Sequence, residues 1–241
     1  MGVQLTVKFK TVCIGLTLGM VACAALSSAS QKKEKGAQGV LIQDKGKFTV
    51  KLAGQTVGHE EFDIAPAEGG WLAKGTSDIK PPQGAPSKVT GSLTLQADGS
   101  PISYQWSAQS DKTNGAHIIF ANGIARITLE MQGARPFQQD LSFNNPLIVV
   151  LDNNLYYQYA VLARIYDWSK GGEQTFPVLI PQDLTPGTVK VLAMGSVNAD
   201  GKTYEGLKVS SSDLEIQLLL DNNHRLIRLE VPEAKVSVMR E

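Results

Sequence analysis

Short runs of β-forming residues, separated by turn residues, fill the sequence from Gly46 to Glu241 and constrain its fold more than any other feature. The runs are rich in Val, Ile, Thr, Phe and Tyr, and a turn follows about every eight to twelve positions, which is typical of an antiparallel all-β domain. Asp98-Gly99 and Asn122-Gly123 are pairs that favour tight hairpin turns. We therefore expect about twelve antiparallel strands, subject to the boundary errors of sequence reading.

Apolar and polar residues alternate within these runs, so each strand has one apolar and one polar face. In residues 214–220, for example, every second position is Leu or Ile. A sheet of about twelve strands must curl, close or split. The predicted fold class is mainly β: a single large curved antiparallel sheet or incomplete barrel.

One segment, residues 155–168, changes to a helical period. Leu155, Tyr159, Leu162 and Tyr166 recur at helical spacing, and neither Gly nor Pro interrupts the segment. Asp152-Asn153-Asn154 supplies N-cap candidates before it, and Gly171-Gly172 follows it. We expect one amphipathic helix at residues 155–168, packed against the concave face of the sheet or closing one end of a barrel.

Residues 1–30 have the order of an export signal: a positive start, an apolar run and then small residues. The sixteen apolar residues at 11–26 are short for a membrane span of about 20, so a retained anchor is the weaker interpretation. Two kinds of processing stay open. A signal peptidase can cut near residues 27–30, or Met20-Val21-Ala22-Cys23 can act as a lipobox, after which Cys23 is acylated and tethers the protein to the membrane.

The sequence thus divides into a signal peptide at residues 1–30, a flexible lead-in at 31–45 and a single antiparallel β domain at 46–241. Both cysteines lie in the leader, which excludes disulfides, thiol nucleophiles and Cys-type zinc sites from the remaining chain. The chain has 23 basic and 23 acidic residues, and the leader removes Lys8 and Lys10 but no acid, which leaves 21 against 23. That balance gives no reason to expect nucleic acid as a partner.

Catalytic and metal motifs are weak throughout. His59-Glu60-Glu61 lies in an expected strand, and we interpret it as an exposed strand face. His117 and His224 belong to no metal-ligand spacing, and the sequence contains neither G-x-S-x-G nor a phosphate-binding loop. We therefore expect no catalytic residue, no metal and no cofactor.

Two Asp-Asn-Asn triplets, at residues 152–154 and 221–223, offer oxygen ligands of the kind that Ca²⁺ prefers. Neither continues with the ligand spacing of a calcium loop. The first triplet is better explained as the helix cap and the second as a hairpin turn.

Aromatic residues crowd into the expected helix. They are Tyr156, Tyr157, Tyr159, Tyr166 and Trp168. One interpretation is a helix that docks on the sheet through a wide aromatic face. The other is the lining of an apolar ligand site, because Tyr157 and Trp168 fall off the main apolar stripe. The candidate ligand-binding residues are Tyr156, Tyr157, Tyr159 and Trp168.

Several short motifs carry a resemblance to known proteins. They are Gly54-x-x-Val57-Gly58-x-Glu60-x-Phe62, Asp98-Gly99-x-Pro101-x-x-Tyr104 and Asp221-x-x-x-Arg225-Leu226-x-Arg228-Leu229-x-Val231-Pro232. With these motifs the chain resembles exported bacterial proteins of unassigned function, and a similar strand pattern precedes some exported esterases. In layout it is similar to the periplasmic lipoprotein carriers (LolA-like), which implies a half-open curved sheet that holds acyl chains in its concave face.

The leading hypothesis is an exported, non-enzymatic protein of the periplasm or cell envelope that binds a hydrophobic small molecule, a lipid or acyl chain. The alternative is an envelope scaffold or interaction module with a filled core, whose partner is another envelope protein. A third hypothesis is an accessory domain of an esterase system, although no nucleophile with a base in reach is evident.

Overall fold

The computed structural model describes residues 39–110 and 112–241, all of which belong to one compact unit. The expected export signal, the cleavage sites, Cys23 and most of the lead-in lie outside the described residues. Within the described part of the chain, no helix has both the length and the apolar character that a membrane span requires.

Fifteen strands form one continuous sheet. The strands are β1 (Asp44–Leu52), β2 (Gln55–Ala67), β3 (Gly70–Ile79), β4 (Ser87–Gln96), β5 (Pro101–Gln109), β6 (Thr113–Ala121), β7 (Ile124–Met131), β8 (Phe137–Ser142), β9 (Val149–Val150), β10 (Glu173–Ile180), β11 (Thr185–Ala199), β12 (Lys202–Ser210), β13 (Glu215–Leu220), β14 (Leu226–Val231) and β15 (Val236–Arg240). A short 3₁₀ turn, η1 (Pro181–Asp183), separates β10 from β11.

The strand order explains why the sheet is an incomplete barrel. It runs β8-β7-β6-β5-β4-β3-β2-β1-β15-β14-β13-β12-β11-β10-β9, so β1 pairs with β15 while β8 and β9, which are consecutive in sequence, form the two edges. Every pairing is antiparallel except that of β9 with β10. The chain is therefore an up-and-down meander that stays open between β8 and β9, which confirms the predicted fold class.

The alternation in the sequence places one face of each strand in the core. Val89, Gly91, Leu93 and Leu95 on β4 are all buried, as the pattern predicts. The hairpins at Asp98-Gly99 and at Asn122-Gly123, where both residues of the second pair have positive φ, are also confirmed. The strand count exceeds the expected twelve partly because a strand of two residues, such as β9, leaves no recognisable run.

A buried ion pair joins the first and last strands. Arg240 on β15 donates from Nη2 to Asp44 Oδ1 on β1 at 2.6 Å, and Asp44 is 7% exposed. The Arg240 guanidinium also lies 5.3 Å from the ring centroid of Phe62, which stacks on Phe48. Leu41 is buried and the Val40 N–H donates to the Ala97 carbonyl, so part of the expected lead-in packs with the domain.

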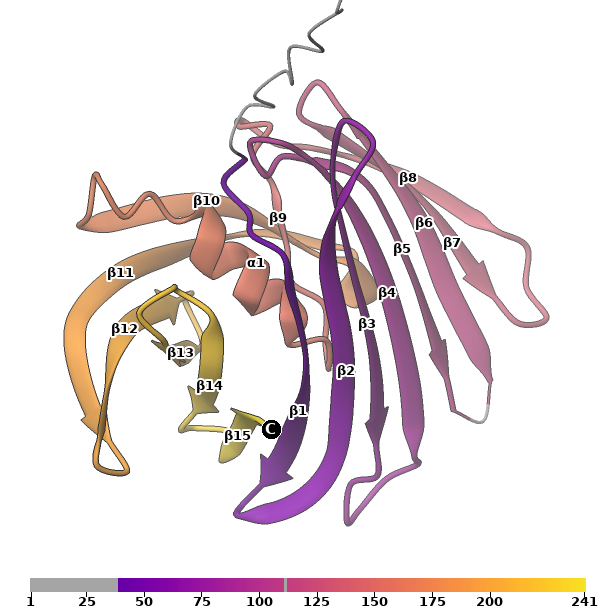
Figure 1. Ribbon diagram of the computed structural model, residues 1–241. Coiled ribbons are helices and arrows are strands. Elements are labelled where there is room, and N and C mark those ends of the chain that lie inside the picture. The colour runs from indigo at the N-terminus through magenta and orange to yellow at the C-terminus, as the bar shows by residue number, and fades with distance from the viewer. Residues whose placement is uncertain (1–38, 111) are drawn as a thin grey trace, which may run out of the picture. The chain divides into compact units, whose positions relative to one another are not determined.

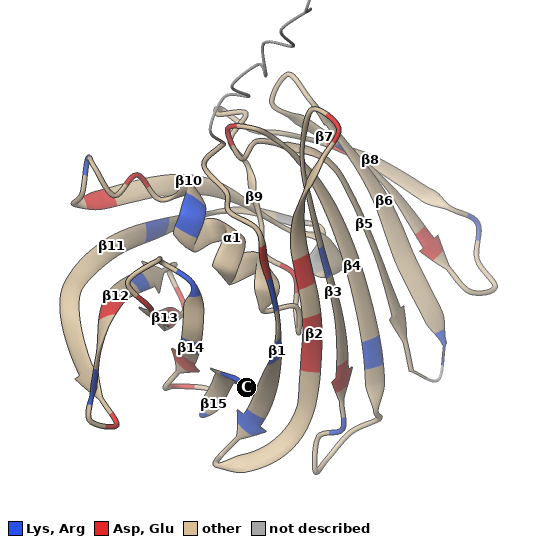
Figure 2. Cartoon of the chain, viewed as in Figure 1, with Lys and Arg blue, Asp and Glu red and all other residues tan. Residues whose placement is uncertain are grey.

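Among the described residues the one α-helix is α1 (Tyr157–Ile165), which is shorter at both ends than expected. At its C-terminal end, Tyr166 already has an extended ψ. Figure 1 shows α1 on the concave side of the sheet, partly surrounded by β10–β15. It contacts β3 in one half of the sheet and β14 in the other. Figure 2 shows charges of both signs interspersed along the strands, with one basic segment on α1, which is Arg164.

Candidate functional site

A buried carboxylate holds the N-terminus of α1 on the sheet. Glu60 on β2 is fully buried, and its two oxygens accept the backbone N–H groups of Tyr156 at 2.6 Å and Tyr157 at 2.9 Å. These are among the N–H groups that a helix leaves without an internal partner. Burial raises the pKa of Glu60 to about 8, although the two N–H donors act in the opposite direction.

Glu60 corrects two expectations from the sequence. His59 and Glu61 are exposed, as predicted, but Glu60 is in phase with the buried Phe62 and Ile64 and was wrongly placed on an exposed face. The predicted cap at residues 152–154 is also wrong, because the helix has no side-chain cap from its own segment. An acid in phase with apolar neighbours was the signal available in the sequence.

Tyr157 fills a notch between two glycines. A Cβ atom on Gly75 of β3 would lie 2.3 Å from the Tyr157 ring, and one on Gly91 of β4 would lie 3.0 Å from its hydroxyl. The ring therefore rests against the backbone of both strands. Tyr157 is fully buried, so the expectation that it falls off the buried stripe is wrong: the helix begins later than predicted, and its first turn faces the sheet.

A second buried network fixes the segment that leads into α1. The Tyr104 hydroxyl on β5 donates to Asp152 Oδ2 at 2.6 Å, and the backbone N–H of Asp152 donates to Gln158 Oε1 on the helix. Asp152 is 5% exposed. Burial and the nearby Asp152 charge raise the pKa of Tyr104 well above its ordinary value, so this phenol stays a hydrogen-bond donor.

Beside this network lies a cavity of about 320 Å³, between α1 and strands β10–β13 on the concave face of the sheet. Its floor is buried and apolar, and consists of Leu151, Val178, Val189, Val209 and Ile216. Tyr159 reaches it from α1 and is half-buried, and burial raises its pKa to about 12. The rim is exposed and mostly polar, with Asn153, Thr188, Ser211, Ser212 and Asp213 beside Leu214. An apolar floor with a few polar groups at the opening is typical of a small-molecule site.

The four candidate ligand residues are not brought together. Tyr159 lines the cavity, whereas Tyr156 and Tyr157 lie at the anchored start of α1. Trp168 lies beyond the helix, where it stacks on His224 with ring centroids 3.9 Å apart. Its Nε1 donates to the Ala163 carbonyl at 3.0 Å. Sequence reasoning missed the strand residues of the cavity, because their alternation is that of any buried strand.

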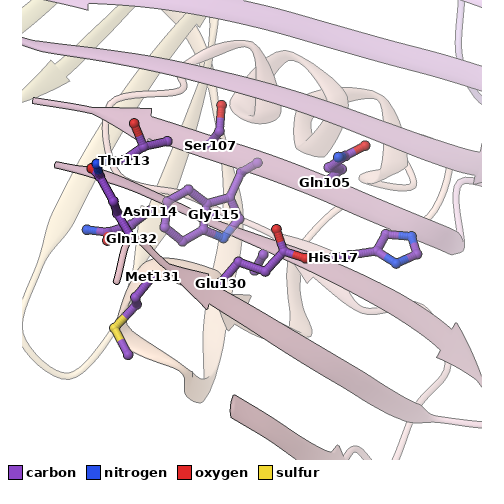
Figure 3. A pocket seen from close by; sticks show the side chains of 11 residues that line it. Gln105, Ser107, Thr113, Asn114, Gly115, His117, Glu130, Met131 and Gln132 are labelled. Atoms are coloured by element: carbon purple, nitrogen blue, oxygen red, sulfur yellow. The ribbon is translucent and has the colours of Figure 1, made fainter. Parts of the chain in front are cut away.

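Another hollow, of about 370 Å³, lies over β5–β7 and differs in chemistry. Figure 3 shows His117 and Gln105 at one end of this hollow and Thr113, Asn114 and Gln132 at the other. Gln105 and His117 are exposed, and each alternates with buried residues of its strand, so these side chains lie on the convex face. Trp106, Ala116 and Met131 also line this hollow, but most of its lining residues are polar, whereas the floor of the concave cavity is formed by buried aliphatic side chains.

Histidine pairs occur away from these hollows. His59 Nδ1 lies 2.9 Å from Glu241 Oε1, and His224 Nε2 lies 2.6 Å from Glu205 Oε2. Neither pair is among the residues that line the hollows described above. Across residues 39–110 and 112–241, no group of three His, Cys, Asp or Glu side chains is arranged to hold a metal ion. The Asp221 carboxylate accepts the backbone N–H groups of Asn223 and Arg225, as a hairpin turn requires.

Comparisons with known proteins report the fold alone. No protein-family model matches the chain, and no curated protein matches it. Among solved structures, it is similar to a β-barrel-like protein of the domain of unknown function DUF1849 from Brucella abortus, with a TM-score of 0.55 and 8% identity over 83% of this chain and 95% of that one. A DUF1089 family protein from Pseudomonas aeruginosa aligns with a TM-score of 0.47 and 11% identity over 73% of this chain and 90% of that one.

Proposed function

We propose that the protein is an exported, non-enzymatic cell-envelope protein that holds a hydrophobic molecule, a lipid or acyl chain, on the concave side of its sheet. The observation that carries this proposal is the cavity beside α1, with its buried apolar floor and its half-buried Tyr159. The resemblance in layout to the lipoprotein carriers, which rests on the sequence motifs alone, motivates the same proposal. Export is proposed from residues 1–30, with acylation at Cys23 as the alternative route to the membrane.

The size of the cavity suits a single apolar chain. Its volume of about 320 Å³ is at the lower end of the range for small-molecule pockets. Each methylene moved out of water contributes about 0.8 kcal/mol, so each added carbon should tighten binding roughly fourfold. The gain should stop when the cavity is full, which makes the dependence on chain length a direct measure of the site.

The scaffold alternative also has an observation in its favour. The half of the concave face beneath the start of α1 is filled by Tyr157, Leu155 and Tyr104 around the two glycines. If the cavity beside α1 closes in solution, the whole concave face becomes a packed core. A partner protein would then have to bind to the outer surfaces of the domain. This alternative predicts no uptake of any apolar chain.

The test is calorimetric titration of the purified exported protein with a series of linear alcohols of increasing length. An affinity that rises about fourfold with each added carbon and then levels off supports the proposal. Absence of binding across the series supports the scaffold alternative. A blocking variant is Gly187→Leu, because Gly187 pairs with Val178 and shares its cavity-facing side. Its matched control is Lys190→Leu, on the opposite face of the same strand. The blocking variant should lose binding while the control retains it.

A further inference from the structure

We infer that the polar end of the ligand is uncharged or cationic, so that the site discriminates against carboxylate-ended chains such as fatty-acid anions. This inference rests on the proposed function, because it concerns the opening of the same cavity. It follows from the charged residues that line the cavity, both of which are acids.

Both charged residues that line the cavity are acids. Asp152 lies in the buried segment before α1, and Asp213 is exposed on the rim, in the turn between β12 and β13. No Lys or Arg is among the lining residues that the structure describes. A carboxylate placed at this rim would therefore meet a like charge and no counter-ion from the lining.

The nearest lysines along the cavity strands do not change this picture. Lys190 on β11 and Lys208 on β12 alternate with buried residues that face the concave side, so both lie on the convex face. Each is already paired there, Lys190 with Glu173 at 3.0 Å and Lys208 with Glu215 at 3.5 Å. Neither is placed to bind an anion at the opening.

The remaining groups of the rim suit a neutral polar end. Ser211 and Ser212 bring hydroxyl groups that both donate and accept hydrogen bonds. An alcohol or a glyceride can use such groups without desolvating a charge, whereas a cation additionally gains from the two acids. An anion gains from neither.

The experiment compares three ligands with the same ten-carbon chain: decanol, decyltrimethylammonium and decanoate. Each is titrated into the purified exported protein by calorimetry at neutral pH and low salt, below its micelle concentration. We expect the dissociation constant of decanoate to exceed that of decanol by about tenfold, because close like charges repel at partly buried positions. Binding of decanoate as tight as that of decanol overturns the inference but leaves the proposed function standing. Failure of all three to bind contradicts the proposed function itself.

A charge variant distinguishes the effect of the rim acid on decanoate binding from the effect of the protein's net charge. Asp213→Asn should tighten decanoate binding several-fold and leave decanol binding unchanged. Glu68→Gln, an exposed acid in the turn between β2 and β3, removes the same charge away from the cavity lining and should change neither. An equal effect of both variants on decanoate would assign the discrimination to net charge and overturn the role of the rim.

Discussion

The two halves of the concave face solve the same packing problem in opposite ways. Beneath the start of α1, glycines on β3 and β4 leave a notch, and the Tyr157 ring fills it completely. Beside the middle of α1, valines on β10–β12 and Gly187 leave space that only Tyr159 reaches. The filled half positions the helix, whereas the open half contains the proposed ligand site.

The largest expected effect is a dependence of stability on pH that originates in the filled half. Folding raises the pKa of Glu60 from 4.5 to about 8, so the folded protein holds a proton that the unfolded chain has released. The stabilisation is therefore complete below pH 4.5 and is lost as pH rises through about 8. The total is roughly 5 kcal/mol of unfolding free energy.

Urea unfolding between pH 5 and about 8 measures this loss. Glu60→Gln cannot titrate, so its unfolding free energy should fall less over the same range. If the wild type and this variant show parallel pH profiles, the carboxyl of Glu60 does not carry the proton in the folded state.

The next largest effect tests whether stability depends on the absence of a side chain at Gly75. Gly75→Ala places a methyl group against the Tyr157 ring, which is fully buried and therefore has little room to move. The same Cβ would lie 2.9 Å from Glu60 Oε1, so we expect a loss of about 3 kcal/mol in unfolding free energy, the upper range for overpacked cores. Gly187→Ala is the matched control, because its new Cβ would meet only the Val178 side chain, at 3.2 Å. Equal losses in both variants would remove the distinction between the filled and open halves.

Local pattern was enough to predict the strands, the hairpins and the presence of one helix on the concave side. The alternation that includes Val89 and Leu93, for instance, predicts which face of the strand is buried, and this prediction does not require knowledge of the neighbouring strands. The roles of Glu60 and Gly75 could not be predicted in this way, because they depend on α1, which lies some eighty to a hundred residues later in the chain. The cavity depends on side chains from α1, the segment before it, four strands and the turn between β12 and β13, and no single segment carries its signature.

A smaller effect is expected at the boundary between the two halves. Tyr104→Phe removes the hydrogen bond to Asp152, whose carboxylate is 5% exposed and also borders the cavity. Loss of a bond to a buried charged group should cost about 2 kcal/mol. The control is Ser107→Ala on the same strand, which breaks the 2.8 Å bond to Thr90 and should cost less than about 1 kcal/mol. Denaturant unfolding of both variants compares the two costs.

The smallest expected effects are those of two aromatic substitutions, one in the cavity and one beyond the end of α1. Tyr159→Ala removes the aromatic group that reaches the cavity from α1, so decanol binding should weaken by about tenfold, a binding free energy of about 1.4 kcal/mol. Trp168→Ala removes the stack on His224 outside the cavity, so it should cost about 1 kcal/mol of unfolding free energy and leave decanol binding unchanged. Calorimetry and denaturant unfolding on the same two preparations resolve both quantities. If Trp168→Ala weakens binding as much as Tyr159→Ala does, the ligand contacts the far end of the helix, and the open half extends beyond the cavity described here.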